Sequence, residues 1–398
     1  MDTVRQIKTF NAGRDPQRLA MKYDTMRSGV FGFFRGSCHL FYDRLSRDGL
    51  PKTFPLVWVC GDLHLENFGS YKGDNCLVYF DINDFDEAAL APASWDLVRM
   101  LSSIRIGADR FAASTVDAQA LCKTFLESYA VALASGKSYW VERDTADGPV
   151  RELLTGLRNR SRTEFLDSRT EIKGNKRAIR VDGKKALSVS KVQRATVKNF
   201  MTSFAQSQSN PDFFKVIDVA RRIAGTGGLG LDRYAILVQG KGSPHGNYLL
   251  DLKRSMPSSL LPTLKVKQPR WKTDAQRVVA LQQRVQAVPM AFLRPVHLGE
   301  VAYVLRDLQP SEDRVATARL SSGHLKDLID SMGKIVAWAN LRSASRQGAA
   351  TLDELIDFGQ RKKWQEKLLK TSLMCAQQVR ADSAAFNAAY DDGAFGAK

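Results

Sequence analysis

The stretch that decides the fold is Gly61-Asp-Leu-His-Leu-Glu-Asn67, followed by Phe80-Asp-Ile-Asn-Asp-Phe-Asp-Glu87. Each stretch lies at the end of an apolar, β-branched run, 56–60 or 75–82, and such runs predict buried strands. We therefore expect one Asp, one Asn and several further carboxylates to gather where two strands end. Asp and Asn are also common in turns and helix caps, so the cluster has a purely structural interpretation as well.

Side chains of this kind suit phosphoryl transfer. One carboxylate can accept the proton of a hydroxyl group, while an amide oxygen and a second carboxylate hold Mg²⁺ against phosphate groups. Mg²⁺ prefers hard oxygen ligands, so the site requires neither His nor Cys.

A glycine-rich stretch in the second half of the chain supplies a phosphate-binding candidate. Gly225-Thr-Gly227-Gly-Leu-Gly230 matches Gly-x-Gly-x-x-Gly, and Lys253 follows on a predicted strand. Glycines let the backbone approach phosphates, and a lysine on a strand can neutralise their charge. The pattern also occurs in dinucleotide-binding turns and in simple tight hairpins. Because 231–239 is typical of a strand rather than a helix, we favour a glycine-rich β-hairpin.

The loop at 61–67 resembles the catalytic loop of aminoglycoside phosphotransferases and other protein-kinase-like enzymes, His-Gly-Asp-x-His-x-x-Asn, with Cys60 in place of the first His. This resemblance implies that Asp62 is the catalytic base and that Mg²⁺ is held by Asn67 and Asp84, with Asp81 as a further candidate ligand. It also implies that Asp96 braces the catalytic loop through backbone N–H groups. The ATP phosphates would be bound by the glycine-rich turn and the strand lysine, that is by Gly225, Gly227, Gly230 and Lys253.

Four motifs in order also resemble the uncharacterised bacterial family called domain of unknown function 2252. They are Phe33-Phe-Arg-Gly36, Gly61-Asp62 with Asn67-Phe-Gly69, Asn83-Asp-Phe-Asp-Glu87 and Trp95-Asp-Leu97. The similarity extends over roughly residues 20–345. The name of this family implies no activity, so the functional expectation rests on the kinase-like motif.

The kinase-like resemblance implies an α+β fold of two lobes, one mostly helical and one a smaller antiparallel sheet. The glycine-rich stretch and Lys253 follow the catalytic loop here but precede it in kinases, so the fold would be circularly permuted. We expect residues 1–140 to begin the helical catalytic lobe and 141–212 to be a basic connector or insertion. Residues 213–310 would form the nucleotide-binding sheet lobe, and 311–398 would complete the helical lobe.

Local patterns predict the remaining elements. We expect helices over 15–50, over 93–135 with a division near 108–114, and over 274–288, 325–345, 352–370 and 372–390. Strands are expected over 216–224, 233–238, 248–252 and 302–306, and a hairpin between 178–181 and 186–189 around Asp182-Gly183. The stretch 308–310 resembles a hinge between lobes, and 332–345 would pack beneath the catalytic loop. The helix 274–288 has no Glu to pair with Lys253, which leaves Gln282 or Gln283 as its hydrogen-bonding partner.

Composition narrows the class of protein. The 398 residues include 59 Lys+Arg and 42 Asp+Glu, a formal charge of +17, and 44% hydrophobic residues, as in globular proteins. No apolar run approaches the ~20 residues of a membrane helix, and the five cysteines form no Cys-x-x-Cys pair. These features predict a cytoplasmic protein without a membrane partner.

The positive charge is concentrated in residues 151–200, which hold 14 Lys+Arg and 5 acidic residues. This segment is either a solvated connector or a polyanion-binding surface. Our leading expectation is an ATP- and Mg²⁺-dependent phosphotransferase that acts on a hydroxyl of a small, anionic molecule. Nucleotidyl (AMP) transfer with the same ligands, and non-catalytic binding of nucleotides or polyanions, remain alternatives. Nucleic acid is the less favoured partner because aromatic residues are not interleaved with the basic ones.

Overall fold

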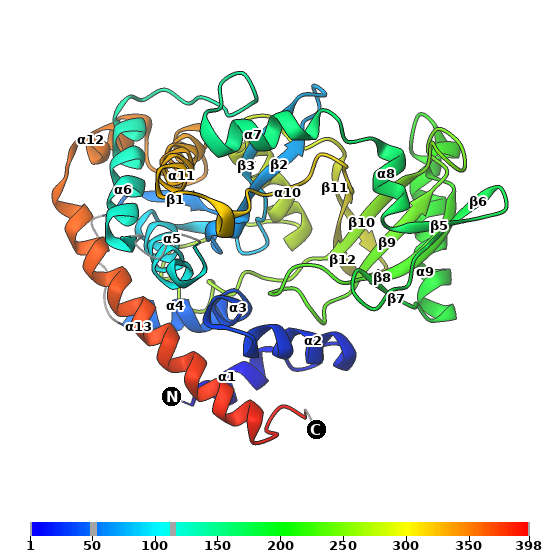
Figure 1. Cartoon of the computed structure of the whole chain (residues 1–398), viewed down its shortest axis with the longest axis horizontal. Coiled ribbons are helices and arrows are strands. Elements are labelled where there is room, and N and C mark those ends of the chain that lie inside the picture. The colour runs from blue at the N-terminus through cyan, green and yellow to red at the C-terminus, as the bar shows by residue number, and fades with distance from the viewer. Residues whose placement is uncertain (1, 48–53, 112–116, 397–398) are drawn as a thin grey trace.

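The computed structural model describes residues 2–47, 54–111 and 117–396. Helices gather on one side of the molecule and a six-stranded sheet lies on the other (Figure 1). All strand pairs among the described residues are antiparallel, so the chain has a mixed α+β fold.

The N-terminal region is helical, but as several short helices rather than one. The expected helix over 15–50 is interrupted at Gly29 and Ser37, and residues 48–53 lie outside the described part of the chain. Gly29 is extended, with φ 165°, and this ends one helix before the next begins. The helices are α1 (Thr3–Phe10), α2 (Pro16–Arg27), α3 (Val30–Gly36) and α4 (Cys38–Arg47).

Two small antiparallel ribbons carry the segments at 60–67 and 83–88. Strand β1 (Leu56–Val59) pairs with β4 (Ala89–Pro92), and β2 (Phe68–Lys72) pairs with β3 (Val78–Ile82). Each segment therefore connects one ribbon to the other: 60–67 links β1 to β2, and 83–88 links β3 to β4. The short helix η1 (Leu65–Asn67) is the last part of the first segment. The predicted strands at 56–60 and 75–82 are confirmed.

Long helices support these ribbons. Helix α5 (Ser94–Gly107) leads through η2 (Ala108–Arg110) to α6 (Ala118–Ala134), and residues 112–116 of the expected division lie outside the described part. Helix α11 (Ser322–Arg342) packs against α6, β1 and β3, so a segment from the far end of the chain lies beside the ribbons.

The C-terminal helices are α12 (Leu352–Gln360) and α13 (Lys363–Asp391). The predicted break near 370–372 is wrong: the chain instead leaves the helix at Arg361 and Lys362, within the helix expected over 352–370, and α13 is a continuous helix of 29 residues. Ser372 is fully buried there and its hydroxyl donates to Leu369 O within the helix, so the polar residue causes no break. Helix α13 runs along the edge of the molecule to α1, which brings the two terminal regions together (Figure 1).

The large sheet has the strand order β11-β12-β10-β9-β8-β7. Its strands are β7 (Ala186–Leu187), β8 (Val216–Arg222), β9 (Arg233–Val238), β10 (Tyr248–Arg254), β11 (Leu293–Leu298) and β12 (Val301–Asp307). The strands β8, β9, β10 and β12 lie where the sequence predicts them, whereas β11 was not predicted. Helix α10 (Asp274–Val285) follows β10 and packs on β11 and β12.

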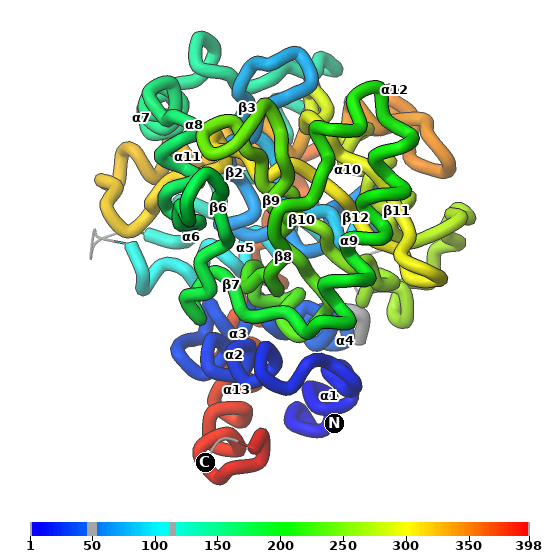
Figure 2. Tube along the Cα trace, turned by 90° about the vertical axis from the view of Figure 1, so that its right-hand side faces the viewer, coloured from blue at the N-terminus to red at the C-terminus, as the bar shows by residue number. Residues whose placement is uncertain are grey.

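The basic segment 151–200 forms helices and strands, and most of its residues are exposed. It contains part of α7 (Gly148–Leu157), α8 (Arg162–Asp167), β5 (Thr170–Lys173), β6 (Lys176–Ile179), β7 and the first part of α9 (Lys191–Gln206). Helix α9 covers the outer face of the sheet, which is turned to the viewer in Figure 2. Residues of α8, β6 and β7 pack on the opposite face.

The hairpin predicted between 178–181 and 186–189 is wrong. Strand β6 pairs with β5 around Gly174-Asn175, and β7 pairs with β8. The Asp182 carboxylate does accept backbone N–H groups of Lys184 and Lys185, so the turn forms. Its two flanks instead find partners elsewhere in the fold, because burial against the sheet outweighs the local turn signal.

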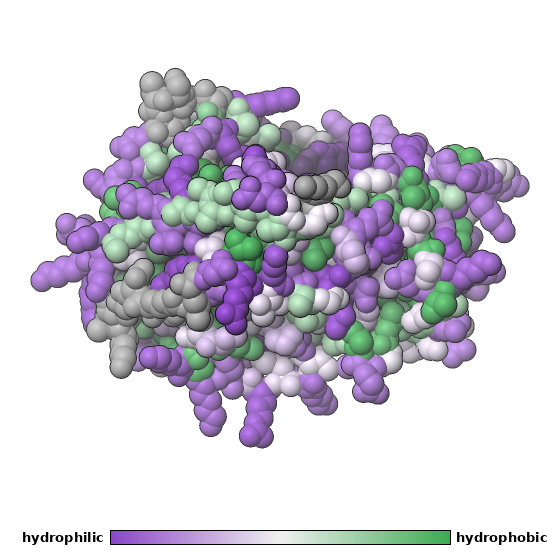
Figure 3. All heavy atoms as spheres, turned by 90° about the horizontal axis from the view of Figure 1, so that it is seen from below, coloured by the Kyte–Doolittle hydropathy of each residue, from purple (hydrophilic) through white to green (hydrophobic). Residues whose placement is uncertain are grey.

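The remaining short helices are η3 (Pro211–Phe214) and η4 (Thr317–Arg319). In the described ranges no helix combines the length and the apolar character needed to cross a bilayer. Hydrophilic side chains cover most of the face seen from below, with hydrophobic ones scattered among them (Figure 3).

Candidate functional site

The start of the loop after β1 is fixed by a buried carboxylate of α5. Asp96 Oδ2 accepts the Cys60 N–H at 2.8 Å and its Oδ1 accepts the Gly61 N–H at 3.0 Å. Gly61 has φ +84°, and a Cβ there would lie 2.2 Å from Glu87 O, so only glycine fits. Burial raises the pKa of Asp96 to about 6, against the lowering effect of these two hydrogen bonds. The predicted bracing role of Asp96 is confirmed.

Asp62, which follows this turn, is paired with a buried arginine. Arg99 Nε and Nη2 lie 2.7 and 2.5 Å from Asp62 Oδ1, and Nη2 also donates to Phe34 O at 3.0 Å. The guanidinium stacks on the Phe34 ring, 4.0 Å from its centroid. Burial raises the pKa of Asp62, although Arg99 opposes the shift. A carboxylate with a raised pKa in a fixed orientation is suited to accept a proton.

Asn67 turns its amide nitrogen towards the two acidic segments. Its Nδ2 donates to Asp62 O at 3.1 Å and to Asp84 O at 3.3 Å. Its buried Oδ1 has no hydrogen-bond partner among the described residues. An unpartnered amide oxygen is a possible oxygen ligand for Mg²⁺.

The segment after β3 carries two carboxylates that meet Lys253. Lys253 Nζ lies 3.6 Å from Asp84 Oδ1 and forms a closer ion pair with Asp86. The charges of Lys253 and Arg233 outweigh the opposing effect of burial and lower the pKa of Asp84. Burial raises the pKa of Asp86, and the Asp84 charge adds to this shift. Residues from opposite halves of the chain therefore meet in one cluster.

Arg277 of α10 anchors this acidic segment, a role that the sequence did not reveal. Its guanidinium donates to Ala88 O at 2.6 Å, Asp86 O at 3.0 Å and Met256 O at 2.9 Å. Gln282, which we expected near Lys253, instead donates to Gln286 Oε1, and Gln283 is exposed. Helix α10 thus fixes the backbone of the carboxylate loop rather than the lysine.

The glycine-rich turn joins β8 to β9 and is held by the N-terminal helices. Arg14 Nη1 donates to Gly227 O at 2.8 Å and Leu229 O at 2.9 Å. The buried Lys22 Nζ donates to Asn11 Oδ1 at 2.9 Å and to Gly227 O at 3.2 Å. Burial lowers the pKa of Lys22 well below its usual value. The turn is therefore positioned by residues about 200 positions away, which no local pattern in the sequence indicates.

These parts surround two cavities that share one wall. The first has a volume of 240 Å³ and is lined by Asp62 and by the glycine-rich turn from Gly225 to Gly228. The second, of 330 Å³, lies between the sheet, α10 and residues 312–314. The shared wall consists of Asp84, Asp86, Gly225, Arg233 and Lys253.

The matching family model covers residues 14–389 and is described as "Uncharacterized protein conserved in bacteria (DUF2252)". The chain belongs to this family. No curated protein and no solved structure matches the chain. The description of the DUF2252 family names no activity.

Of the predicted site residues, Asp62, Asp84, Gly225, Gly227 and Lys253 line the first cavity. Asn67 lines neither cavity, although its Nδ2 contacts the backbone of Asp62 and Asp84. Asp81 lines neither cavity. Its Oδ2 accepts the Ala287 N–H at 3.1 Å and lies 3.3 Å from Arg342, so it joins β3 to α10 and α11. Gly230 is also outside the cavity lining; with φ +89°, it packs where a Cβ would lie 2.7 Å from Arg14 Cβ.

The described residues contain no group of three or more His, Cys, Asp and Glu side chains arranged to hold a metal ion. Mg²⁺ does not require such a group, because it often binds one or two protein oxygens and completes its shell with water and phosphate oxygens. The unpartnered Oδ1 of Asn67 and the ionised Asp84 fit that requirement.

Proposed function

We propose that this protein is an ATP- and Mg²⁺-dependent phosphotransferase that acts on a hydroxyl of a small, anionic molecule. The observation that carries the proposal is the meeting of Lys253 with Asp84 and Asp86 in a cavity also lined by Asp62 and the glycine-rich turn. A carboxylate base, carboxylate and amide metal ligands, a lysine and a glycine turn are the parts that phosphoryl transfer needs.

The order of elements in the sheet supports a kinase-like nucleotide lobe. A glycine-rich turn connects β8 and β9, Lys253 lies on the next strand, and α10 and the hairpin β11–β12 follow. Protein kinases place their glycine-rich loop and strand lysine in the same succession. We infer a circularly permuted, two-lobed arrangement, for which the proximity of α1 and α13 provides a simple topological basis.

Helix α10 has no glutamate to pair with Lys253, and two aspartates take that place. Kinases pair the strand lysine with a helix glutamate, whereas Lys253 pairs with Asp84 and Asp86 and α10 contributes Arg277 to the same segment. The helix is therefore coupled to the carboxylates directly. This supports the assignment of Asp84, rather than Asp81, to the metal.

In the proposed reaction the acceptor hydroxyl lies against Asp62. Its proton passes to the Asp62 carboxylate as its oxygen bonds to the γ-phosphorus, and the bond from that phosphorus to the β-phosphate oxygen breaks to release ADP. Arg99 holds one Asp62 oxygen and so orients the base. Arg14 and Arg35 line the same cavity and would bind an anionic group of the acceptor. Mg²⁺ held by Asn67 and Asp84 would neutralise phosphate charge.

Calorimetric titration with Mg·ATP tests the proposal. We expect the wild-type protein to bind, Asp84→Asn to bind at least about tenfold more weakly, and Asp74→Asn, an exposed carboxylate in the β2–β3 turn, to bind normally. A wild-type protein that binds no Mg·ATP would contradict the proposal. Incubation with α- and γ-labelled ATP then identifies the transferred group, because only γ-label on the acceptor supports phosphoryl rather than AMP transfer.

A further inference from the structure

The face of the large sheet that points away from α9, here called the inner face, carries a group of charged side chains. Side chains at every second position share a face, and the registers of β8, β9, β10 and β12 align these positions. Apolar residues such as Ile236, Leu252 and Leu305 occupy the outer face beneath α9. The inner face carries instead a charged set, which lines or underlies the second cavity: Arg222, Arg233, Asp251, Lys253 and Arg306.

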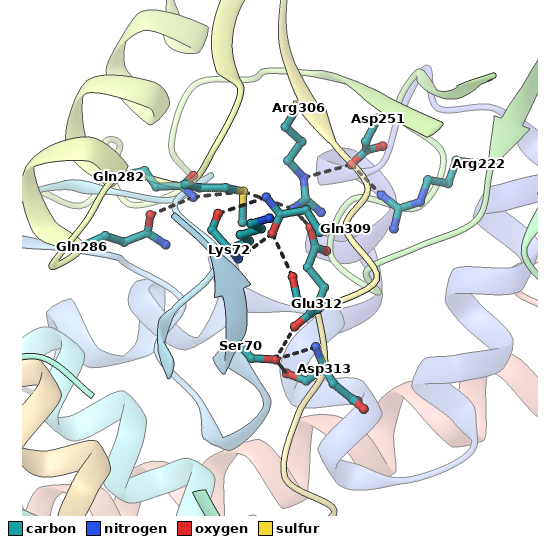
Figure 4. Close-up of polar contacts among 12 residues, drawn as sticks. Ser70, Lys72, Arg222, Asp251, Gln282, Gln286, Arg306, Gln309, Glu312 and Asp313 are labelled. Atoms are coloured by element: carbon teal, nitrogen blue, oxygen red, sulfur yellow. Dashed lines mark hydrogen bonds and ion pairs between the residues drawn. The ribbon is translucent and has the colours of Figure 1, made fainter. Parts of the chain in front are cut away.

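Three guanidinium groups of this face share one buried carboxylate. Asp251 Oδ2 lies 2.5 Å from Arg222 Nη1, 2.6 Å from Arg233 Nη2 and 3.3 Å from Arg306 Nε. Asp251 is completely buried, and Figure 4 shows Arg222 and Arg306 reaching it from two sides. Arg306 has a second partner in Glu312 at 2.9 Å. Two carboxylates thus serve three arginines.

Arg222 is the least compensated of the three. Its buried Nη1 lies close to Asp251 without the geometry of a hydrogen bond, and no other acceptor among the described residues bonds to it. Burial lowers the pKa of Arg222 to about 10; Asp251 opposes this shift, and Arg233 and Arg306 add to it. The side chain therefore stays protonated at neutral pH and retains an unused donor.

Another carboxylate, outside the lining of the second cavity, is shared in the same way. Glu66 lies 2.5 Å from Arg35 Nη1, 2.9 Å from Arg110 Nη1 and 3.6 Å from Arg314 Nη1. Arg314 lines the second cavity, and its side chain is 52% exposed. The other acidic residues that line the cavity are already paired, Asp84 and Asp86 with Lys253 and Asp313 with Arg160. Four arginines of the cavity lining, Arg222, Arg233, Arg306 and Arg314, thus share three carboxylates, those of Asp251, Glu312 and Glu66.

We propose that this cavity, bounded by Arg222, Arg306 and Arg314, is a binding site for an oligophosphate anion. Guanidinium groups present planar, paired donors that match phosphate oxygens, and an under-neutralised cluster gains most from such a ligand. The cavity adjoins Lys253 and Gly225, so a phosphate chain held there continues towards the reacting centre. The arginine cluster alone carries this inference. If the proposed function holds as well, the phosphate chain of ATP would lie in this second cavity.

The probe is sodium tripolyphosphate, titrated calorimetrically in buffer freed of divalent metals. We expect binding by the wild-type protein that weakens at least about tenfold in Arg222→Met and in Arg314→Met, since each loses a charge-assisted contact. Arg222→Lys, which keeps the charge but not the fork of donors, should bind with intermediate affinity. Lys215→Met removes an exposed positive charge just before β8 and should bind as the wild type does. Thermal unfolding of each variant establishes that it is folded.

The outcomes separate this inference from the proposed function. Absence of tripolyphosphate binding by the wild type, equal binding by the Arg222 and Arg314 variants, or an equal loss in Lys215→Met would each overturn the inference. Competition by adenosine, without any effect of the arginine substitutions, would place a nucleoside in the cavity and overturn it too. Tripolyphosphate binding that depends on Arg222 would support it even if the protein binds no Mg·ATP, in which case only the phosphotransferase proposal fails. Competition by ATP distinguishes a nucleotide tail from a free oligophosphate as the source of the phosphates.

Discussion

Replacement of Arg99 by methionine tests the ion pair that holds Asp62. Arg99 is fully buried, holds Asp62 Oδ1 with two nitrogens, and stacks on Phe34. Methionine fills similar volume but leaves the Asp62 carboxylate without its counter-charge. Removal of one partner of a buried pair costs about 3–5 kcal/mol, because the remaining charge is uncompensated. We expect the free energy of unfolding to fall by that amount near neutral pH.

The pH dependence of the loss identifies its origin. Burial raises the pKa of Asp62 in the folded protein, and removal of Arg99 eliminates the opposing effect. A carboxyl group whose pKa is higher in the folded than in the unfolded protein favours the folded state when it is protonated. This contribution is complete at pH values below the unfolded-state pKa and is lost as the pH rises through the folded-state pKa. The deficit of Arg99→Met relative to the wild type should therefore be smaller at pH 5 than at pH 8.

The assay is urea unfolding followed by tryptophan fluorescence at both pH values. Arg110→Met is the matched control, because Arg110 is about half exposed and its ion pair with Glu66 should contribute at most about 1 kcal/mol. Adding Asp62→Asn to Arg99→Met should recover part of the loss, since a neutral amide replaces the unpaired carboxylate. An equal deficit at pH 5 and pH 8, or no recovery in the double variant, would refute this reasoning.

Three further substitutions test the supports of the site, each by its free energy of unfolding. Asp96→Asn should cost about 2–3 kcal/mol, because one amide oxygen cannot accept both the Cys60 and Gly61 N–H groups; an unchanged stability would show that the pair is unimportant. Gly61→Ala should cost at least about 2 kcal/mol, owing to φ +84° and the nearby Glu87 O, whereas Gly174→Ala, at positive φ in open space, should cost about 1 kcal/mol; similar losses would contradict the steric argument. Arg277→Met should cost about 3 kcal/mol because three carbonyl groups lose a charged donor, and a loss no larger than that of Arg284→Met, in the last turn of α10, would argue against the anchoring role.

The acidic half of the site could be predicted from the sequence because its members are close along the chain. Asp62, Asn67 and Asp84 belong to segments that flank two short ribbons, and Asp96 starts the next helix. Strand ends and turns are local features, so apolar runs followed by Asp and Asn were sufficient to locate them. Asp84 lines the cavity and Asp81 does not, and the pairing of Asp81 with Arg342 became visible only in the tertiary structure.

The arginine cluster was within reach of the sequence and was missed. Residues 222, 233, 251 and 306 are charged positions within or at the ends of the strands, and side-chain alternation places them on one face once the strand pairing is known. Burial of so many charged groups in one sheet is unusual unless they are paired or bind a ligand. Charged residues at alternate positions of neighbouring strands were therefore the sequence feature that could have indicated this site.

The sequence by itself determined the strand ends, the acidic loops and the glycine-rich turn, since each depends on backbone preferences and hydrophobic patterning within a few residues. Only the tertiary structure decided that Lys253 meets Asp84, that Lys22 and Arg14 hold the glycine-rich turn, and that Arg277 anchors the carboxylate loop. The flanks of Asp182-Gly183 likewise pair with β5 and β8 instead of each other. Such contacts join residues far apart in the chain, and they form because burial and charge pairing across the whole fold outweigh the preferences of any single segment.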